Sequence, residues 1–458
     1  MGNEQLNNKM MEFKEDIFAS IRESVAIESV KGPAEENAPY GRGPKEALDH
    51  MLALGEKLGF KTGNVDDRVG WIEYGEGEEM VGILGHVDVV PLGEGWDYDP
   101  LGCEVHDGKM YGRGVVDDKG PTIGALYAMK AIKDLGLPID RRIRIMFGSD
   151  EENGSSCVKH YIEVGGEKPT IGFTPDAEYP VIFCEKGQMF WEVTKEVENP
   201  STVPVLSIEG GTAKNVVTPK CTMVIEGDFD FPESEGITVT KENGNTVIVS
   251  MGKGAHGSLP HLGKNAAIQL FQAIRKNGID LGGDLQKMID FVLDKINTTT
   301  RGEDLGICYE DEETGDTSVC FGVVNCTKEK LFFTLDVRYP KRADAEETER
   351  KIKEAAAAYG LTAIIEQTGK LVYVSKESEL VQKLMKVYKE QTGRDEEPIA
   401  IGGGTYAKAF DNMVAFGPLF PGDPDTIHQP NEYGEIDKLM KSFQIVAQAM
   451  YELAQKDA

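Results

Sequence analysis

A histidine and an aspartate stand in the sequence where a strongly apolar run ends. The segment 81–88 reads Val-Gly-Ile-Leu-Gly-His-Val-Asp and ends in His86 and Asp88. A continuous apolar run is typical of a strand buried on both faces of a mostly parallel sheet, and functional groups collect at the carboxyl ends of such strands. We therefore expect His86 and Asp88 at one edge of the sheet, where an imidazole and a carboxylate could serve a metal ion.

Further carboxylates follow other expected strands and turns. Asp117 lies in a glycine-bounded turn, Glu151 and Glu152 follow an expected strand at 141–149, and Asp176 follows the next strand. Ionised carboxylates cannot share one cleft unless something cationic compensates them, and a divalent metal is the economical answer. Mixed imidazole and carboxylate ligation suits zinc, cobalt or manganese, whereas the absence of a Cys-x-x-Cys pair excludes an all-thiolate zinc site.

The seven histidines fall into two groups. His86 ends the apolar run, His256 lies in Gly252-Lys-Gly-Ala-His-Gly-Ser, and His428 lies in Asp423-Pro-Asp-Thr-Ile-His-Gln-Pro-Asn-Glu. These three stand beside residues that suggest chemistry. We interpret the other four as ordinary hydrogen-bonded residues; they are His50, His106, His160 and His261.

The order of helical and strand patterns predicts an α/β fold with a mostly parallel central sheet flanked by helices. The expected elements of the first half are a helix with Phe13, Ile17, Ile21 and Val25 on one face, strands near 59–65, 70–74, 81–88 and 141–149, and a helix over 121–135. Pro121 opens that second helix in its first turn. Helical periodicity returns at Leu380 and along the final helix, from Ile436 to Leu453.

The sequence changes character from about Gly187 onward. Strands of alternating polarity, near 188–194, 245–250 and 331–338, are accompanied by helices near 265–277 and 345–359. A half-exposed sheet with helices on one side indicates a second, α+β domain. We therefore predict a discontinuous first domain made of 1–186 and 375–458, with 187–374 inserted into it.

The composition argues against a nucleic-acid-binding protein and against a membrane protein. The chain has 78 acidic and 49 basic side chains and a net charge of -29, which would repel nucleic acid and anionic lipid surfaces. No stretch approaches the roughly 18 continuous apolar residues that a membrane span needs, and the first residues contain no export or lipidation signal. The seven cysteines are scattered and odd in number. We expect reduced thiols and a cytoplasmic location.

Taken together, these motifs resemble the M20 family of dinuclear metallopeptidases, most closely its PepV-like bacterial dipeptidase branch. The matching stretches span almost the entire chain in the family's order. They are Leu84-Gly-His-Val-Asp-Val-Val-Pro, Gly93-Glu-Gly-Trp, Tyr111-Gly-Arg-Gly-Val-Val-Asp-Asp-Lys-Gly-Pro, Glu151-Glu, Pro175-Asp-Ala-Glu-Tyr-Pro, Ala255-His-Gly-Ser, Ile401-Gly-Gly-Gly-Thr-Tyr and His428-Gln-Pro-Asn-Glu.

The resemblance implies two divalent metal ions, with zinc as the first choice and manganese or cobalt as alternatives. Asp117 would bridge the ions, with His86 and Asp176 completing one site and Glu152 and His428 the other. Asp88 would orient His86 and raise its basicity. The resemblance also implies a cis peptide between Asp117 and Asp118.

The resemblance further assigns the catalytic and substrate-binding roles. Glu151 would be the general base that takes a proton from a metal-bridging water, and His256, on the inserted lid domain, would stabilise the oxyanion. Residues expected to hold the substrate are Asn215, Arg338 and the loop of Gly403, Gly404 and Thr405. The long lid resembles that of relatives in which one chain supplies the whole site, so we predict a monomer.

The resulting hypothesis is a dipeptidase that hydrolyses small dipeptides with a free amine and a free carboxylate. One alternative is an amidohydrolase of the same family that deacylates N-acyl amino acids. Another is a non-catalytic protein that uses the metal to bind peptides. Glu151 and His256 argue against that second alternative, because a protein that only binds has no need of a base beside the water.

Overall fold

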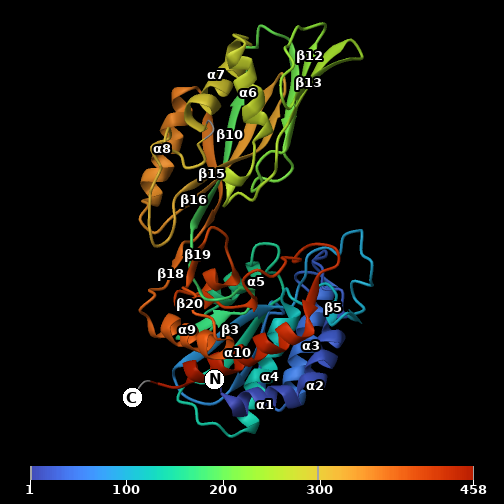
Figure 1. Ribbon diagram of the computed structural model, residues 1–458, viewed down its shortest axis with the longest axis vertical. Helices are drawn as coiled ribbons and strands as arrows, with labels where there is room; N and C mark the ends of the chain where they lie inside the picture. Colours follow the sequence, from blue (N-terminus) through green and yellow to red (C-terminus); the bar gives the residue numbers. More distant parts are fainter. Residues whose placement is uncertain (1–2, 297–298, 457–458) are drawn as a thin grey trace. The chain divides into compact units, whose positions relative to one another are not determined.

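A computed structural model describes residues 3–296 and 299–456 of the chain (Figure 1). The chain divides into two compact units. The first unit comprises Met1–Cys184, Val372–Ile399 and Thr405–Ala458, and the second comprises Glu185–Leu371 and Ala400–Gly404. The first unit is thus built from three stretches of sequence, and the short segment Ala400–Gly404 belongs to the second unit although its neighbours on both sides belong to the first.

A nine-stranded sheet forms the centre of the first unit, with the order β1-β2-β6-β3-β7-β20-β9-β18 and with β19 paired to β9. The strands are β1 (Lys61–Val65), β2 (Val69–Tyr74), β3 (Met80–His86), β6 (Arg142–Gly148), β7 (Ile171–Thr174), β9 (Ile182–Glu185), β18 (Val372–Tyr373), β19 (Ile399–Ile401) and β20 (Met413–Ala415). The four central strands, β6, β3, β7 and β20, are parallel. The sheet is antiparallel where β1 meets β2, β2 meets β6 and β20 meets β9.

The central strands are fully buried, as their unbroken apolar sequences predict. Every residue of β3 and of β6 is buried. The antiparallel edge has a local cause: only three residues separate β1 from β2, a connection too short for the crossover that a parallel pair requires. Asp66 and Asp67 both have positive φ in this tight turn.

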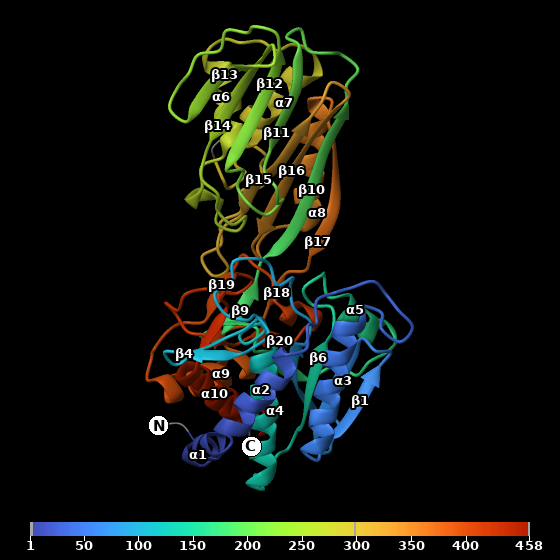
Figure 2. The ribbon, with the colours of Figure 1, turned by 90° about the vertical axis from the view of Figure 1, so that its right-hand side faces the viewer.

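Long helices cover one face of this sheet, and a short helix covers the other (Figure 2). Two helices, α4 (Lys119–Asp134) and α10 (Ile436–Ala454), pack directly on β3 and β6, and α3 (Arg42–Lys57) packs on β1 and β2. The others form an outer layer: α1 (Glu4–Glu12) and α2 (Lys14–Val25) pack on α4, and α9 (Glu379–Thr392) packs on α10. Gly124 lets α4 and α10 approach closely, because a Cβ there would overlap the ring of Phe443. The opposite face buries Leu84 and Met146 against α5 (Ser156–Glu163) and the short helix η3 (Tyr406–Ala409).

Two small sheets stand beside the central one. One consists of β4 (Glu104–His106), β5 (Lys109–Tyr111) and β22 (Tyr433–Glu435), and the other of β8 (Ala177–Glu178) and β21 (Pro418–Leu419). Tyr433 pairs with Tyr111 in the antiparallel register of β22 and β5. This pairing fixes the segment that follows His428 beside the segment that precedes Asp117.

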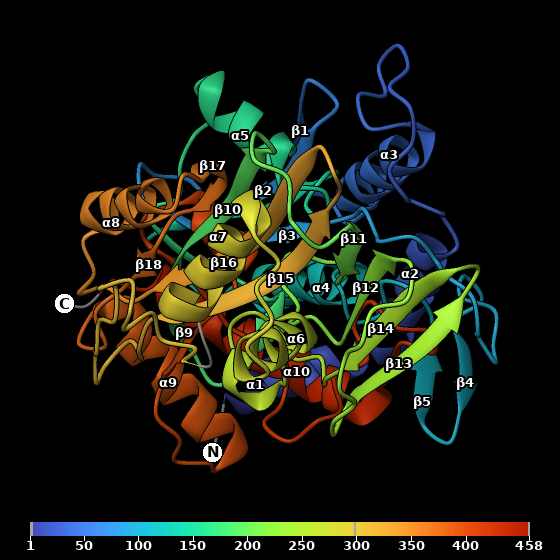
Figure 3. The ribbon, with the colours of Figure 1, turned by 90° about the horizontal axis from the view of Figure 1, so that it is seen from above.

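The second unit contains an eight-stranded antiparallel sheet with the order β13-β14-β12-β11-β15-β16-β10-β17 (Figure 3). Its strands are β10 (Gly187–Glu196), β11 (Val205–Gly210), β12 (Lys220–Glu226), β13 (Ile237–Glu242), β14 (Asn245–Met251), β15 (Ser318–Cys326), β16 (Lys330–Tyr339) and β17 (Thr362–Gly369). β10 and β12 alternate between buried and half-exposed residues, which is the pattern of a sheet packed on one face.

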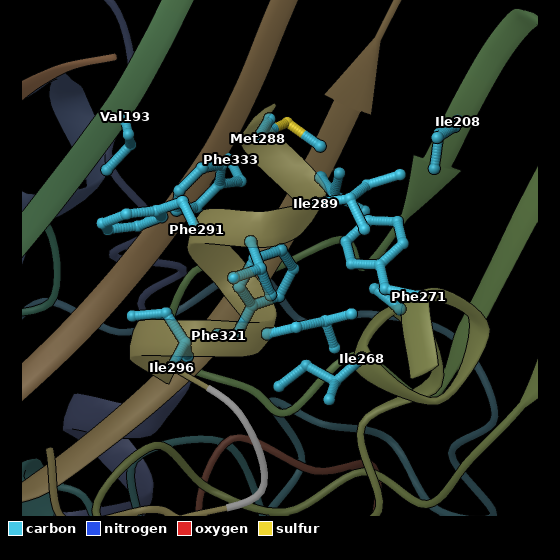
Figure 4. Packing of buried hydrophobic residues seen from close by; sticks show 14 of the residues in the cluster. Val193, Ile208, Ile268, Phe271, Met288, Ile289, Phe291, Ile296, Phe321 and Phe333 are labelled. Atoms are coloured by element: carbon cyan, nitrogen blue, oxygen red, sulfur yellow. The ribbon is translucent and has the colours of Figure 1, made fainter. Parts of the chain in front are cut away.

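Three helices cover the buried face of this second sheet: α6 (Ala266–Lys276), α7 (Gly283–Phe291) and α8 (Ala345–Ala358). Met288, Ile289 and Phe291 of α7 enter the same apolar cluster as Phe321 and Phe333 of the sheet (Figure 4). The sequence analysis identified α6 and α8 but not α7, whose start at two glycines with positive φ does not resemble a standard helix N-terminus.

The predicted α/β fold is confirmed, with one refinement: the central sheet is mixed, and parallel only across its four middle strands. No helix within residues 3–296 and 299–456 is long and apolar enough to cross a membrane. All seven cysteines are free thiols.

Candidate metal centre

Three adjacent strands of the first unit place acidic residues and a histidine at one edge of the sheet. β3 lies between β6 and β7, and the three run in parallel. His86 is the last residue of β3, Glu151 and Glu152 follow β6, and Asp176 follows β7. The carboxyl ends of parallel strands meet at the same edge, so residues distant in sequence become neighbours there.

His86 presents one ring nitrogen to this edge. Its Nδ1 lies 3.0 Å from the main-chain carbonyl oxygen of Asp88, and a carbonyl can only accept, so Nδ1 carries the proton. Nε2 is then free to act as a ligand. This nitrogen is fully buried and has no hydrogen-bond partner within the described part of the chain, although Asp117 Oδ1 lies 3.0 Å and Asp176 Oδ2 3.6 Å from it.

Asp117 lies between two imidazoles. Its Oδ1 faces His86 Nε2, while its Oδ2 lies 2.9 Å from Nε2 of His428. The Asp117–Asp118 peptide bond is cis, as the sequence analysis predicted. His428 has a φ of 62° and lies in the loop between β21 and β22. The structure therefore brings residues 86 and 428 to the same carboxylate.

Glu152 completes a compact cluster. Its Oε2 lies 3.1 Å from His428 Nε2, and its side chain is almost fully buried. Ligand atoms of His86, Asp117 and Glu152 all lie within 4.8 Å of one another, a separation that one metal ion can span. Together with Asp176 and His428, five potential ligands surround this point, four of them carrying largely buried side chains.

The electrostatics of the cluster favour a cation. Burial raises the pKa of Glu151 well above its ordinary value and that of Asp176 above its own. Contacts with Asp117 and Glu152 raise the pKa of His428 to about 10, and the carboxylates around His86 raise its pKa although burial opposes the shift. The surplus of negative charge thus draws protons onto imidazoles that would otherwise be neutral.

These imidazole and carboxylate groups suit a divalent metal ion better than they suit the protons that would otherwise bind the imidazoles. The free Nε2 of His86, with its tautomer fixed by the Asp88 carbonyl, is a ligand atom aimed at the acidic cluster. Imidazole and carboxylate donors together are typical of zinc, manganese and cobalt sites. The residues present therefore suit a metal centre, and His86, Asp117, Glu152, Asp176 and His428 are those that would hold it.

Asp88 was expected to orient His86 and raise its basicity. The contact with the His86 ring comes from the main-chain carbonyl of Asp88, whereas the nearer carboxylate oxygen lies 3.6 Å from Nδ1. The carboxylate accepts hydrogen bonds from the amides of Glu151 (3.0 Å) and Glu152 (3.2 Å). Asp88 is fully buried and thus ties the turn after β6 to the end of β3.

The second unit brings together three of the predicted substrate and catalytic residues. The amide of Gly257, next to His256, donates to the Asn215 carbonyl over 2.6 Å. His256 Nδ1 lies 2.7 Å from Ser258 Oγ, and burial together with the charge of Arg338 lowers the pKa of His256. Both effects favour the neutral form of the imidazole.

Arg338 is held within the second unit by hydrogen bonds from its guanidinium group. Its Nε and Nη2 donate to Asp336, at 3.1 and 2.8 Å, and its Nη1 donates to the carbonyl of Gly402 over 2.5 Å. The residue is only 3% exposed. A guanidinium has five N–H groups, so these contacts leave donors with which Arg338 could bind a substrate as predicted.

The loop at 402–405 is divided between the two units, with Gly403 and Gly404 in the second and Thr405 in the first. A Cβ at Gly402 would lie 2.5 Å from Ser258 Cβ, whereas a Cβ at Gly403 would meet nothing closer than 3.6 Å. Glycine is thus needed sterically at 402. Thr405 caps η3, because its hydroxyl accepts from the amide of Ala407.

Sequence reasoning missed several residues that shape the site. Asp118 accepts hydrogen bonds from the His86 amide (3.1 Å) and from Thr122 Oγ1 (2.8 Å). Tyr406 packs edge-on against the His86 ring at a centroid distance of 6.2 Å. Glu432, fully buried, accepts from the amide of Asp117. Asp118, Tyr406 and Glu432 all stand inside the recognised motifs, and that position was the only available signal.

Comparison with known proteins identifies the family to which this chain belongs. The family described as "Peptidase family M20/M25/M40" matches residues 82–452, more than half of the chain. The chain therefore belongs to this family of metallopeptidases and is a hydrolase.

Curated relatives match nearly the full length. "Putative dipeptidase YtjP" of Bacillus subtilis (strain 168) is 38% identical and the match covers 96% of this chain and 98% of the relative. "Putative dipeptidase SH1171" of Staphylococcus haemolyticus (strain JCSC1435) is 35% identical and covers 97% and 98%. Among solved structures, human carnosine dipeptidase 1 superimposes with a TM-score of 0.62 at 15% identity, covering 100% of both chains. At that identity the likeness concerns the fold.

Proposed function

We propose that this protein is a metal-dependent dipeptidase that hydrolyses the peptide bond of unblocked dipeptides, and that it belongs to the PepV-like branch of its family. The observation that carries the proposal is the carboxylate of Asp117 between the imidazoles of His86 and His428. Glu152 and Asp176 complete the ligand set, and Glu151 stands beside it. The names of the curated relatives support dipeptides as the substrate class.

Two divalent ions, when bound, would polarise the scissile carbonyl and lower the pKa of water toward neutrality. The proton transfers and the binding of the substrate would be carried out by side chains of the protein. Glu151 would accept a proton from the attacking water and deliver it to the leaving amine nitrogen as the carbon–nitrogen bond breaks. The Asp88 carboxylate accepts a hydrogen bond from the Glu151 amide and so fixes the backbone from which the Glu151 side chain extends.

We infer that the second unit acts as the lid predicted from sequence. His256 would donate from Nε2 to the carbonyl oxygen as that oxygen gains charge, because the amide of Ser258 approaches Nδ1 at 3.4 Å and makes that nitrogen the acceptor. Asn215 and Arg338 would hold the substrate's carbonyl or carboxylate, and the loop of Gly403, Gly404 and Thr405 would receive its free carboxylate. The monomeric state and the cytoplasmic location remain predictions.

The test is a comparison of free and blocked dipeptides on protein loaded with zinc, manganese or cobalt. A free dipeptide such as β-alanyl-histidine should be hydrolysed with a higher kcat/KM than its N-acetylated form. Preference for the acetylated substrate would favour the deacylase alternative. A metal-loaded protein that hydrolyses neither substrate but binds both would favour the non-catalytic alternative.

A further inference from the structure

Glu432 and Arg113 form a buried ion pair that the proposed reaction does not use. Glu432 is fully buried, Arg113 is 2% exposed, and Arg113 Nη1 donates to Glu432 Oε2 over 2.7 Å. Taking two charges out of water is expensive, and apolar residues of similar volume often stabilise a core at least as well. Because the pair is buried this deeply, we interpret its role as holding neighbouring segments in position.

One oxygen of Glu432 organises the turn that carries Asp117. Oε1 accepts from three backbone amides: those of Gly114 (3.1 Å), Val116 (3.1 Å) and Asp117 (3.3 Å). Successive amides that converge on one anion define the path of the backbone around it. With Oε2 facing Arg113, both oxygens have donors, so Glu432 is placed to position ligands rather than to be one.

The same pair holds the segment that carries His428. Arg113 Nη2 donates to the carbonyl of Gln429, the residue after His428, over 3.3 Å. The amide of Gly112 donates to the main-chain carbonyl of Glu432 over 3.0 Å. Donors of 112–117 and acceptors of 429–432 thus cross-link the two segments, and any change in their separation would shift Asp117 Oδ2 relative to His428 Nε2.

We propose that the Glu432–Arg113 pair is a positioning device that sets the spacing between Asp117 and His428 and thereby the affinity of this centre for a divalent cation. The inference rests on the proposed function only in treating Asp117 and His428 as metal ligands. It requires no substrate and assigns no step of the reaction to Glu432.

The test is a metal titration of the Glu432→Gln variant. Glutamine keeps an oxygen for the amides but would turn an NH₂ group toward Arg113, so donor would face donor. We expect the affinity for Zn²⁺ and Co²⁺, measured by competition with a chelating dye, to fall about 10- to 100-fold. The visible absorption of bound Co²⁺ should change as well, while the circular dichroism stays that of the wild type.

Glu73→Gln is the matched control. Glu73 is also a largely buried carboxylate with arginine partners, Arg142 and Arg144, each at 2.6 Å. Arg142 lies opposite Met80, at the far end of β3 from His86. This variant should bind both metals as the wild type does. An equal loss of affinity in Glu73→Gln would overturn the proposal, because general destabilisation would then explain the effect.

Two further measurements keep the proposal testable if Glu432→Gln does not fold. Arg113→Lys retains the charge but not the fork that reaches Gln429, and it should also weaken metal binding. In the wild type, metal should slow hydrogen exchange in 112–117 and 428–433 together, and protection of only one segment would contradict the proposal. Wild-type affinity in both folded variants would overturn it, whereas a chain that binds metal but cleaves no dipeptide would refute only the proposed function.

Discussion

At the scale of single residues, the site depends on groups whose charge or tautomer is set by buried neighbours. The Asp88 carbonyl fixes the tautomer of His86, and the Asp88 carboxylate holds the backbone of Glu151 and Glu152. Two histidines outside the site differ from each other. His160 contacts the exposed Asp66 at 2.7 Å, as expected of an ordinary surface histidine. His50 instead has a buried Nε2 without a hydrogen-bond partner among the described residues, so the expectation of an ordinary hydrogen-bonded residue is wrong there.

Glu151→Gln tests the proposed base. The amide cannot accept the water's proton, so kcat should fall by about 10²- to 10⁴-fold. Metal content and thermal stability should not change, because the side chain is not one of the five proposed ligands. Steady-state kinetics with a free dipeptide and metal analysis of the same preparation provide the measurement.

The control for this variant is Glu163→Gln, which alters an exposed carboxylate at the end of α5. It should retain wild-type activity. Activity of Glu151→Gln within a few-fold of wild type would remove Glu151 from the mechanism and leave the metal site without a base.

At the scale of secondary-structure elements, close contacts between β3 and α4 position the ligand-bearing segments. Gly85 is the point of closest approach: a Cβ there would collide with Thr122 Oγ1 and lie 2.6 Å from Asp118 Oδ2. Asp118 in turn accepts from the amide of His86. The end of the strand and the start of the helix are therefore locked together by small residues and one carboxylate.

Gly85→Ala should destabilise the first unit by about 1–3 kcal/mol, the usual effect of forcing an extra carbon into a packed core. Urea unfolding of the metal-free protein measures the effect. Gly32→Ala is the matched control, because a Cβ at Gly32 would meet nothing closer than 3.8 Å. Equal stability of the two variants would show that β3 and α4 can separate without penalty.

Asp284, at the start of α7, provides a pH-dependent contribution to the second unit. Burial by itself raises its pKa, but the hydrogen bonds from the amides of Asn199 and Glu198, each 2.9 Å, outweigh burial and lower the pKa to about 2. An aspartate in an unfolded chain has a pKa of about 3.9. Folding thus favours the charged form of Asp284.

The stabilisation from Asp284 is therefore present above about pH 4 and is lost as the pH falls through 4 toward 2, amounting to about 2–3 kcal/mol. Asp284→Asn should be less stable than wild type at pH 6, and the difference should shrink at pH 3. Hydrogen exchange of peptides from β10 and β16 measures the second unit selectively. A difference that does not depend on pH would contradict this origin.

At the scale of the whole molecule, the net charge is -29, and folding gathers part of the acidic side chains into a cluster at one edge of the sheet. Metal binding and stability must be coupled, because an ion that binds only the folded chain stabilises it. At free metal near 1,000 times the dissociation constant this stabilisation is about 4 kcal/mol.

Removal of metal by a chelator should lower the midpoint of thermal unfolding and abolish hydrolysis, and zinc, manganese or cobalt should restore both. The gain in stability should diminish as the pH falls below about 10, since His428, whose pKa is raised to about 10, must lose its proton before it can bind metal. Scanning calorimetry with and without metal gives the measurement. A midpoint that metal does not change would show that the acidic cluster is not a metal centre.

The sequence alone determined which elements form and where their functional residues stand. The unbroken apolar runs predicted β3 and β6, and heptad-like spacing predicted α10, because burial imposes these periodicities directly on the sequence. Family motifs singled out the candidate residues, since their order along the chain is itself sequence information. Not every element was found: α7 begins without a standard N-terminal signal, and the regular helix α3 was missed as well.

Tertiary structure alone decided which groups meet and in which atomic roles. His428 is more than 300 residues from His86 and Asp117, and only the loop before β22, held against β5 by strand pairing, brings them together. The part played by Asp88 is likewise a matter of geometry, because a residue's carbonyl and carboxylate have the same place in sequence but face different partners. Spacing along a chain fixes which elements form, but the directions of hydrogen bonds and the burial of charge exist only once the chain is packed.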